Sequence, residues 1–383
     1  MKPSIDKHLI GEPDSMRIAY ISLHWPRPAA SSIGKKIIQQ TAAWREAGHE
    51  VHFFSHMHPP NDRGSLIEGS RFVYQAEKGI TGGLKTEIRR IKAAAELINA
   101  VSEYQPDIIY LRWAMYVYPI QRLFRIAPVV VEINTNDIRE HQFLGVAHNL
   151  YNRLTRGIIL GGASGHVFAT NELMVLPDFS GFHKPGIVIT NGIDLRETPL
   201  YPAPNNTPPR LIFIGTPGMA WHGVDKLVDL AKDFPDLAID IVGLDETDTT
   251  TGIPDNLTLH GFLEGAAYEA VMARADAAIG TLSLHVKGMQ EAATLKIRDC
   301  TARGIPCILP YEDPDFTGMD SRLILQIPNT MENIETHGRA IHDFTLQARG
   351  RRIGRETIAG RIDSRVKETQ RLEFFQKISE SRC

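Results

Sequence analysis

Two series of strand-like and helix-like segments, separated by a proline-rich stretch, constrain the fold of this chain most strongly. The first series begins with RIAYISL at residues 17–23, continues with a helical pattern over residues 35–47, and includes the apolar runs PDIIYL, PVVVEIN and GHVFAT. The second follows RETPLYPAPNNTPPR at residues 196–210 and contains LIFIG, HGVDKLVDLAKD, LAIDIVG, LTLHGF, AAIGTL and IPCILP. Strands that are apolar on both faces and alternate with helices are typical of parallel sheets.

The length of the chain also favours two domains. It has 383 residues, and single hydrophobic cores stop growing at about 250–300 residues. We therefore predict an α/β protein with two Rossmann-like, doubly wound parallel-sheet domains that face a central cleft. The expected domains are residues 16–194 and 210–360, joined by a linker at 195–209. A flexible leader at 1–15 and a C-terminal helix at 361–383, packing back toward the first domain, complete the prediction.

Composition excludes several classes of protein. The formal net charge is −3, whereas duplex binding usually needs a clustered basic excess, so we expect no nucleic-acid partner. The three cysteines, Cys300, Cys307 and Cys383, show no metal-ligand or disulfide spacing. No run approaches the ~20 apolar residues of a membrane span. We expect a protein of the reducing cytoplasm, without a metal site.

The segment MQEAATLKIRDCTARGIPCI at residues 289–308 is the most informative stretch. Thr294 is a suitable N-cap for a helix over residues 295–303, and Gly304 is a suitable C-terminal stop before a buried strand. The first turn of such a helix has free backbone N–H groups and a partial positive charge, so it favours anions.

Charged side chains surround the start of this predicted helix. Lys296 adds a full positive charge, and Asp299 offers two acceptor oxygens to a sugar diol. Glu291 lies in the loop before the helix. Together these three side chains are suited to a phosphorylated sugar, with separate contacts for the phosphate, the ribose and a second sugar.

The order and spacing of several motifs resemble the retaining GT-B glycosyltransferases of family 4, over nearly the whole chain from residue 17 to about 378. Glu291, then LKIRD and ARGIPCI, resemble the family's paired acidic residues before GxP and an apolar strand. AGHEV, NGID, FIG with WHGVDKL, and HGF resemble further motifs in the same order. The resemblance implies the GT-B fold, a nucleotide diphosphate sugar as donor substrate, no permanently bound cofactor and no metal.

The resemblance also implies roles for individual residues. Glu291 would contact the transferred sugar and Asn134 would orient the acceptor, and both are candidate catalytic residues. The candidate donor-binding and nucleotide-binding residues are Asp299, Lys296, Leu295, Gly215, Thr216, His222 and Lys287. The candidate acceptor-side residues are Gly34, Glu132 and Asp137. Enzymes of this kind are thought to react on one face of the sugar, with the leaving phosphate taking the proton of the acceptor.

Four positions depart from the family pattern. Asp299 replaces a second glutamate, TPGM follows the FIG strand without the family's arginine, His222 replaces a lysine, and Asn134 replaces a histidine. Other roles stay open for the candidates. Glu132 could pair with Arg112 in the core, His222 could cap a helix, and Lys296 and Asp299 could be solvated helix charges.

Residues 84–101 form a second pattern of interest. Six apolar residues recur at helical spacing, and Lys85, Arg89, Arg90 and Lys92 fall elsewhere on the helix. A helix that covers a sheet and a helix that lies on an anionic membrane both fit this pattern.

We interpret the sequence as a cytoplasmic, metal-independent hexosyl- or related glycosyltransferase in cell-surface polysaccharide or lipid-linked glycan biosynthesis. Its partners would be a nucleotide sugar and a glycan or lipid-linked acceptor, with peripheral contact to the inner face of the membrane left open. The alternatives are a sugar-nucleotide epimerase or hydrolase on the same fold and a non-catalytic partner protein.

Overall fold

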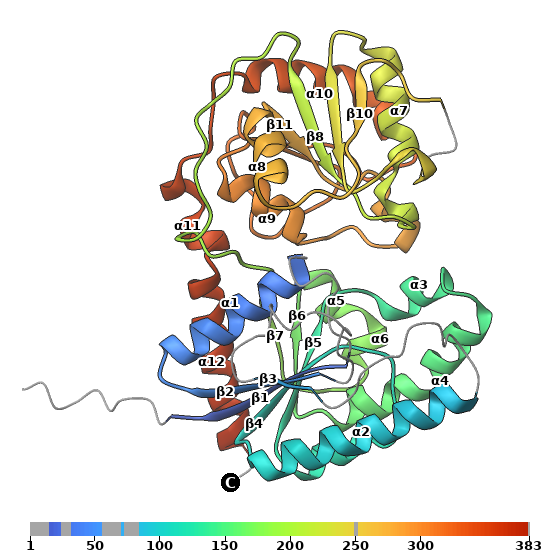
Figure 1. The fold of residues 1–383 in the computed structure, drawn as a ribbon, viewed down its shortest axis with the longest axis vertical. Coiled ribbons are helices and arrows are strands. Elements are labelled where there is room, and N and C mark those ends of the chain that lie inside the picture. The colour runs from blue at the N-terminus through green and yellow to red at the C-terminus, as the bar shows by residue number, and fades with distance from the viewer. Residues whose placement is uncertain (1–14, 24–31, 56–69, 73–83, 249–251, 382–383) are drawn as a thin grey trace, which may run out of the picture.

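The computed structural model describes residues 15–23, 32–55, 70–72, 84–248 and 252–381. The predicted leader therefore lies almost entirely outside the described residues. Two parallel sheets stand one above the other in Figure 1, each covered by helices. The first has seven strands in the order β3-β2-β1-β4-β5-β6-β7, and the second has six in the order β10-β9-β8-β11-β12-β13. The predicted α/β class with two doubly wound parallel sheets is confirmed.

The first half contains β1 to β7. In chain order its elements are β1 (Arg17–Ser22), α1 (Ser32–Glu46), β2 (Glu50–Ser55), β3 (Ser70–Phe72), α2 (Leu84–Tyr104), β4 (Ile108–Arg112), η1 (Ile120–Arg125), β5 (Val129–Ile133), α3 (Asp137–Gln142), α4 (Val146–Gly162), β6 (Gly165–Phe168), α5 (Asn171–Val175), α6 (Pro177–Ser180) and β7 (Gly186–Val188). The central strands are fully buried, because helices cover both faces of the sheet.

The second half repeats this alternation. Its elements are β8 (Arg210–Ile214), η2 (Ala220–His222), α7 (Val224–Asp233), β9 (Ala238–Val242), η3 (Glu246–Asp248), β10 (Leu257–Leu259), α8 (Gly265–Arg274), β11 (Ala277–Ile279), η4 (Leu284–Lys287), α9 (Leu295–Ala302), β12 (Cys307–Leu309), β13 (Ile324–Gln326), α10 (Asn333–Ala348), α11 (Arg355–Ile362) and α12 (Ser364–Glu380). No helix or strand lies between β7 and β8, where the proline-rich stretch connects the two sheets.

The chain crosses between the halves twice. After α11, the last helix α12 returns to the first half and packs against α1 (Figure 1). The rings of Trp44 on α1 and Phe375 on α12 lie 5.4 Å apart, and the Trp44 indole donates a hydrogen bond of 2.8 Å to Glu368. Both rings are fully buried. The C-terminal helix therefore completes the core of the first half.

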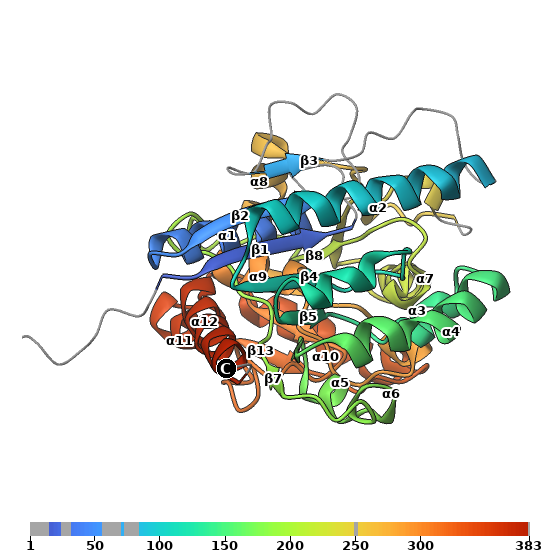
Figure 2. The same ribbon diagram turned by 90° about the horizontal axis from the view of Figure 1, so that it is seen from below.

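The helix α2 differs in part from its predicted pattern. Its C-terminal part packs into the core through Leu97, Ile98 and Val101, as expected of a helix that covers a sheet. Ile88 and Ile91, two of the six apolar residues at helical spacing, are exposed. The helix extends past the edge of the sheet here, so its N-terminal turns have fewer neighbours to cover these side chains (Figure 2).

Candidate functional site

The helix α9 (Leu295–Ala302) begins at the predicted residue and ends one residue before the predicted end. Its N-cap is Thr294, whose side chain accepts a hydrogen bond from the backbone N–H of Ile297. Gly304 follows the helix with φ +83°, in the left-handed region that glycine adopts without strain. The first turn of α9 therefore presents its free N–H groups beside the ends of β8 and β11.

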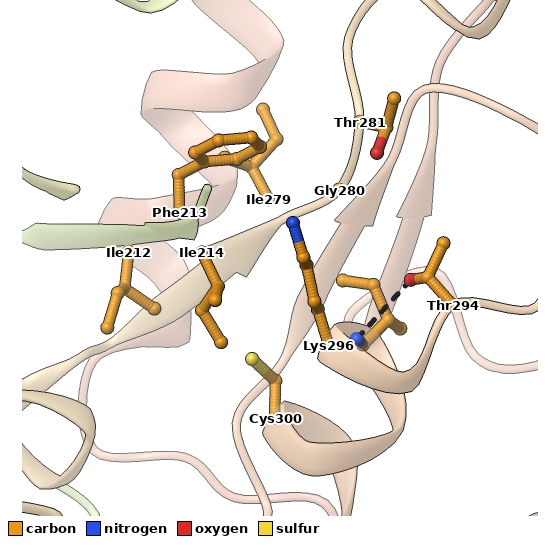
Figure 3. Close-up of a pocket in the computed structure, with 10 residues that line it drawn as sticks. Ile212, Phe213, Ile214, Ile279, Gly280, Thr281, Thr294, Lys296 and Cys300 are labelled. Carbon is orange, nitrogen blue, oxygen red and sulfur yellow. Dashed lines mark hydrogen bonds between the residues drawn. The ribbon is translucent and has the colours of Figure 1, made fainter. Parts of the chain in front are cut away.

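A small pocket lies between α9 and the ends of β8 and β11. Figure 3 shows Lys296 rising from α9 toward the strand ends that carry Ile214 and Gly280. The Lys296 Nζ lies 3.2 Å from the Thr216 hydroxyl and 3.1 Å from the His222 Nε2. Burial lowers the pKa of Lys296 to about 7. Three predicted nucleotide-binding residues are thus neighbours in space.

His222 is a neutral member of this group. Burial, with smaller contributions from Lys296 and Lys287, lowers its pKa to about 3. Its Nδ1 accepts from the backbone N–H of Thr216 at 3.3 Å, which assigns the ring proton to Nε2. The Nε2–H of His222 then points at the Lys296 amine. The amine can accept a hydrogen bond from it only when the amine is neutral, because a protonated amine has no free lone pair. The arrangement agrees with the lowered pKa of Lys296.

The loop before α9 contacts the first half of the molecule through Glu291. The backbone N–H of Glu172, in the first turn of α5, donates to the Glu291 carboxylate at 3.0 Å. In return, the backbone N–H groups of Glu291 and Gln290 donate to the Glu172 carboxylate at 2.8 and 2.9 Å. Glu172 was not among the predicted residues, because it lies 119 positions from Glu291 and belongs to no motif.

Lys287 makes a second contact between the halves. Its ammonium lies 2.7 Å from the Thr135 hydroxyl and 3.4 Å from the Glu140 carboxylate. It also lies 4.2 Å from the centre of the Trp221 ring, within the range of a cation–π interaction. Burial lowers its pKa, and Glu140 opposes that shift. The polar contacts of Lys287 are thus with the first half, and the residue was predicted to contact the donor.

Asp299 is engaged within its own half. The Tyr268 hydroxyl donates to one carboxylate oxygen at 2.6 Å, and the Arg303 guanidinium donates to the other at 2.9 Å. Arg303 also pairs with Glu269. Each carboxylate oxygen retains a second lone pair. A ribose contact by Asp299 would therefore be added to an existing network, which the sequence alone did not reveal.

The first half contains a second buried charged group. Lys36 donates to Glu132 at 2.6 Å, to Asn191 at 2.7 Å and to Asn134 at 3.2 Å. Arg112 donates to the other oxygen of Glu132 at 2.8 Å, which is the core pairing that the sequence left open. Burial alone would raise the pKa of Glu132, but the cations Lys36 and Arg112 outweigh it and hold the pKa well below its usual range.

Asn134 is linked through this group to the second half. Lys36 joins it to Asn191, and the Asn191 amide donates to the carbonyl of Ala293 at 2.6 Å. Ala293 is two residues from Glu291. Lys36 was missed by sequence reasoning, because a lone lysine in a helix usually faces solvent. Asn191 lies in the NGID motif but was not proposed as a site residue.

The remaining predicted residues have mainly packing environments. Asp137 is buried and forms a two-point ion pair with Arg156 at 2.8 and 2.9 Å. Gly34 is buried in the first turn of α1. A Cβ at Gly215 would lie 2.5 Å from the Leu244 side chain, so close packing requires glycine there. Leu295 is the half-buried first residue of α9. No group of three or more His, Cys, Asp or Glu in the described parts of the chain is arranged to hold a metal.

Comparisons with known proteins agree with this fold. Residues 37–197 match the family model described as Glycosyltransferase Family 4, whereas no curated protein sequence matches the chain. Sucrose-phosphate synthase from Thermosynechococcus elongatus is similar in structure, with a TM-score of 0.69, 15% identity, and coverage of 96% of this chain and 100% of that one.

Two further structures are similar over the same extent. The catalytic domain of starch synthase IV from Arabidopsis thaliana, bound to ADP and acarbose, has a TM-score of 0.63 and 12% identity, covering 96% of this chain and 100% of that one. An alpha-glucosyltransferase in complex with UDP has a TM-score of 0.61 and 13% identity, covering 94% and 100%. Residues 37–197 are therefore similar to the Glycosyltransferase Family 4 model, and the chain as a whole has the two-domain α/β fold of GT-B glycosyltransferase structures.

Proposed function

We propose that this protein is a glycosyltransferase that moves a sugar from a nucleotide diphosphate sugar to an acceptor hydroxyl, with retention of configuration. The observation that carries the proposal is the group of Lys296, Thr216 and His222 beside the first turn of α9. An ammonium, a hydroxyl and free backbone N–H groups are suited to the oxygens of a diphosphate. In this proposal residues 210–360 bind the donor and residues 16–194 bind the acceptor.

We assign a separate role to each of three side chains around this group. A diphosphate beside Lys296 would raise the pKa of that amine, and the protonated amine would then stabilise the charge that develops on the leaving phosphate. Glu291 lies in the loop before α9 and is assigned to hydroxyls of the transferred sugar. Asn134, linked through Lys36 and Asn191 to that loop, is assigned to orient the acceptor.

The proposed transfer needs no separate protein base. The bond between the anomeric carbon and the leaving phosphate oxygen breaks, and a bond from that carbon to the acceptor oxygen forms on the same face. The acceptor proton passes to the leaving phosphate. We propose a sugar of hexose type and an acceptor in cell-surface polysaccharide or lipid-linked glycan biosynthesis. The buried free thiols of Cys300 and Cys307 support a location in the reducing cytoplasm.

A non-catalytic partner protein is the second candidate. Two observations favour it: His222 is neutral where the family has a lysine, and the stretch after β8 lacks the family's arginine. Fewer permanent charges remain to stabilise a leaving diphosphate. Such a protein would bind nucleotides without turning a donor over.

A panel of nucleotide sugars distinguishes the candidates. Binding to the native state raises the melting temperature, so thermal shift identifies the nucleotide and sugar. Product analysis with that donor then shows transfer to an acceptor, hydrolysis, epimerisation or no reaction. Transfer that is lost in Lys296→Ala and Glu291→Gln supports the proposal. Binding without turnover, under conditions that include acceptor glycans, supports the partner protein.

A further inference from the structure

The helix α4 buries Ile159 and Leu160 in the core, but it also buries two polar side chains and exposes several large apolar ones. Surface helices bury apolar side chains and expose polar ones. In α4 the buried residues include Asn152 and Arg156, whereas Val146, Leu150 and Leu154 are 87%, 56% and 73% exposed. Ile158, one more turn along, is also exposed. A repeat of four residues places these four apolar side chains on one face of the helix.

The buried polar residues have a local cause. Asn152 and Arg156 both bind the carboxylate of Asp137 at the start of α3, at 2.6 and 2.8 Å. Because Asp137 is itself buried, removing these partners would leave an unpaired charge. This pairing fixes which face of α4 points inward. The outward face could be polar without any cost to the fold, so its leucines are not explained by packing within the half.

Neighbouring elements extend the apolar surface. The Tyr151 hydroxyl of α4 donates to the carbonyl of Tyr116 at 3.1 Å. Arg90 of α2 is also near Tyr151: burial raises the pKa of Tyr151, and the charge of Arg90 opposes this shift. Ile88 on α2 and Tyr118 before η1 are 45% and 50% exposed. Figure 1 shows α2 at the end of the first half farthest from the second half, with α4 beside it in the same half.

The charge around this surface is positive. Arg153 on α4 and Arg122 and Arg125 on η1 are exposed, and η1 contacts both α2 and α4. The sequence has no Asp or Glu from residue 143 to residue 170, and none from 113 to 131. On α2, Glu87 pairs with Arg90, whereas Glu96 and Glu103 are exposed farther along the same helix. An apolar face bordered by arginines and poor in carboxylates matches the interface of an anionic lipid bilayer.

We propose that the outward face of α4, with the adjoining exposed residues of α2 and η1, docks on an anionic lipid bilayer. The helix would lie in the plane of the interface, roughly 25 Å long, with Leu150 and Leu154 among the acyl chains and Arg153 at the headgroups. A second copy of the chain fits less well, because a symmetric pairing would bring the arginines of η1 and α4 together without carboxylates to neutralise them. This inference goes beyond the proposed transfer activity and does not depend on it.

None of the described helices is long and apolar enough to cross a membrane. The proposed contact is peripheral. Salt should weaken it, because ions in solution screen the attraction between the exposed arginines and the anionic headgroups.

Vesicle sedimentation of the full chain, without any nucleotide, tests the proposal. Wild-type protein should sediment with vesicles rich in phosphatidylglycerol and remain in solution with pure phosphatidylcholine. Leu150→Ser combined with Leu154→Ser should lower the partition coefficient at least roughly tenfold, because two apolar side chains no longer enter the acyl region. Phe262→Ser combined with Met331→Ser is the matched control, since both side chains are 64% exposed on the second half, and it should bind as wild type.

A second measurement keeps the test independent of variant stability. Leu154→Trp should show a blue-shifted emission when phosphatidylglycerol vesicles are added, and Phe262→Trp should not. Wild-type protein that stays in solution with anionic vesicles would overturn the proposal. A self-association that disappears in the double serine variant, without vesicle binding, would also overturn it and assign the face to a second copy.

Discussion

Glu172 and Glu291 hold each other by reciprocal hydrogen bonds across the two halves of the molecule. Each backbone N–H donates to the carboxylate of the other residue, at 3.0 and 2.8 Å. The carboxylate that we assign to the transferred sugar is thus engaged by the acceptor-side half. A donor sugar that reached Glu291 would have to share or replace this bond.

The first prediction concerns Glu172. Glu172→Ala removes the acceptor of two backbone N–H groups in the loop that carries Glu291. One charge-assisted hydrogen bond contributes about 1.5–3 kcal/mol, and water can replace the exposed bond from Gln290, so the transfer rate should fall by roughly ten- to a hundredfold. Affinity for free nucleotide diphosphate should change less than about twofold, since its proposed site lies on the other half. Steady-state kinetics and calorimetry measure the two effects, with the exposed Glu335→Ala as control. Equal losses in both would show that Glu172 acts on the nucleotide instead.

The second prediction concerns Lys296. Lys296→Met should weaken nucleotide diphosphate binding by about 1.5–3 kcal/mol, because a charge-assisted contact is lost. Without ligand the same variant should be more stable than wild type near neutral pH. The pKa of Lys296 is about 7 in the folded protein and 10.5 in its unperturbed state. Below pH 10.5 folding is therefore opposed, because the buried amine either loses its proton or keeps its charge away from water.

The sign of the stability difference gives a control for this variant. Since the unfolded chain binds more protons between the two pKa values, wild-type stability rises with pH across that range. The advantage of Lys296→Met should therefore be largest below pH 7 and shrink as the pH rises. Thermal unfolding at several pH values measures it. A variant that is less stable than wild type at all pH values would show that the amine supports the fold.

The third prediction is a proton uptake on binding. A diphosphate favours the charged amine of Lys296, so the complex has a higher pKa than the free protein, in which it is about 7. Affinity should fall as the pH rises above 7, by at most about tenfold per pH unit. Calorimetry in two buffers of different ionisation enthalpy would detect the proton directly. The slope should be absent in Lys296→Met, and a slope that persists there would assign the proton to another group.

The fourth prediction separates a structural from a catalytic role for Glu132. Glu132→Gln would leave Lys36 and Arg112 without their carboxylate in a buried site. Breaking a buried pair in this way costs about 3–5 kcal/mol, so the free energy of unfolding in urea should fall by that amount. Glu140→Gln, whose partner Lys287 lies 3.4 Å away, is the control and should fall by much less. A stable Glu132→Gln with lost transfer would instead indicate direct contact with the acceptor.

The fold was predictable because its signals are local. Apolar runs, turns and the alternation of helices and strands can be read within a few residues, and α9 with its Thr294 cap is an example. The short strand β3 and the exposed N-terminal turns of α2 were not predictable in this way. Both depend on where the sheet ends, which is set by the whole domain.

The candidate site was predictable only for residues that lie in motifs. Lys296, Thr216 and His222 were proposed from different motifs, and the structure brings their side chains together. Glu172 and Lys36 were missed, because each acts through a partner about a hundred positions away. Their side chains gain meaning from tertiary contacts and not from neighbours in sequence.

The last prediction compares Asp299 with Glu291. Asp299→Asn replaces a carboxylate that accepts from Tyr268 and Arg303, so stability should fall by about 1–3 kcal/mol. If Asp299 also holds the ribose, donor and free nucleotide diphosphate should both bind about 1–3 kcal/mol more weakly. Glu291→Gln should bind free nucleotide diphosphate nearly as well as wild type while transfer falls, since its proposed partner is the sugar.

Tyr268→Phe is the matched control for this comparison. It keeps the pair between Asp299 and Arg303 but frees one carboxylate oxygen, so a ribose held by Asp299 should bind at least as tightly as in wild type. If Asp299 serves only the fold, Asp299→Asn should lower the melting temperature and leave nucleotide affinity unchanged. Affinity lost in Glu291→Gln but kept in Asp299→Asn would reverse the two assignments. Calorimetry and unfolding on the three variants distinguish these outcomes, because binding and stability respond to different partners of the same carboxylate.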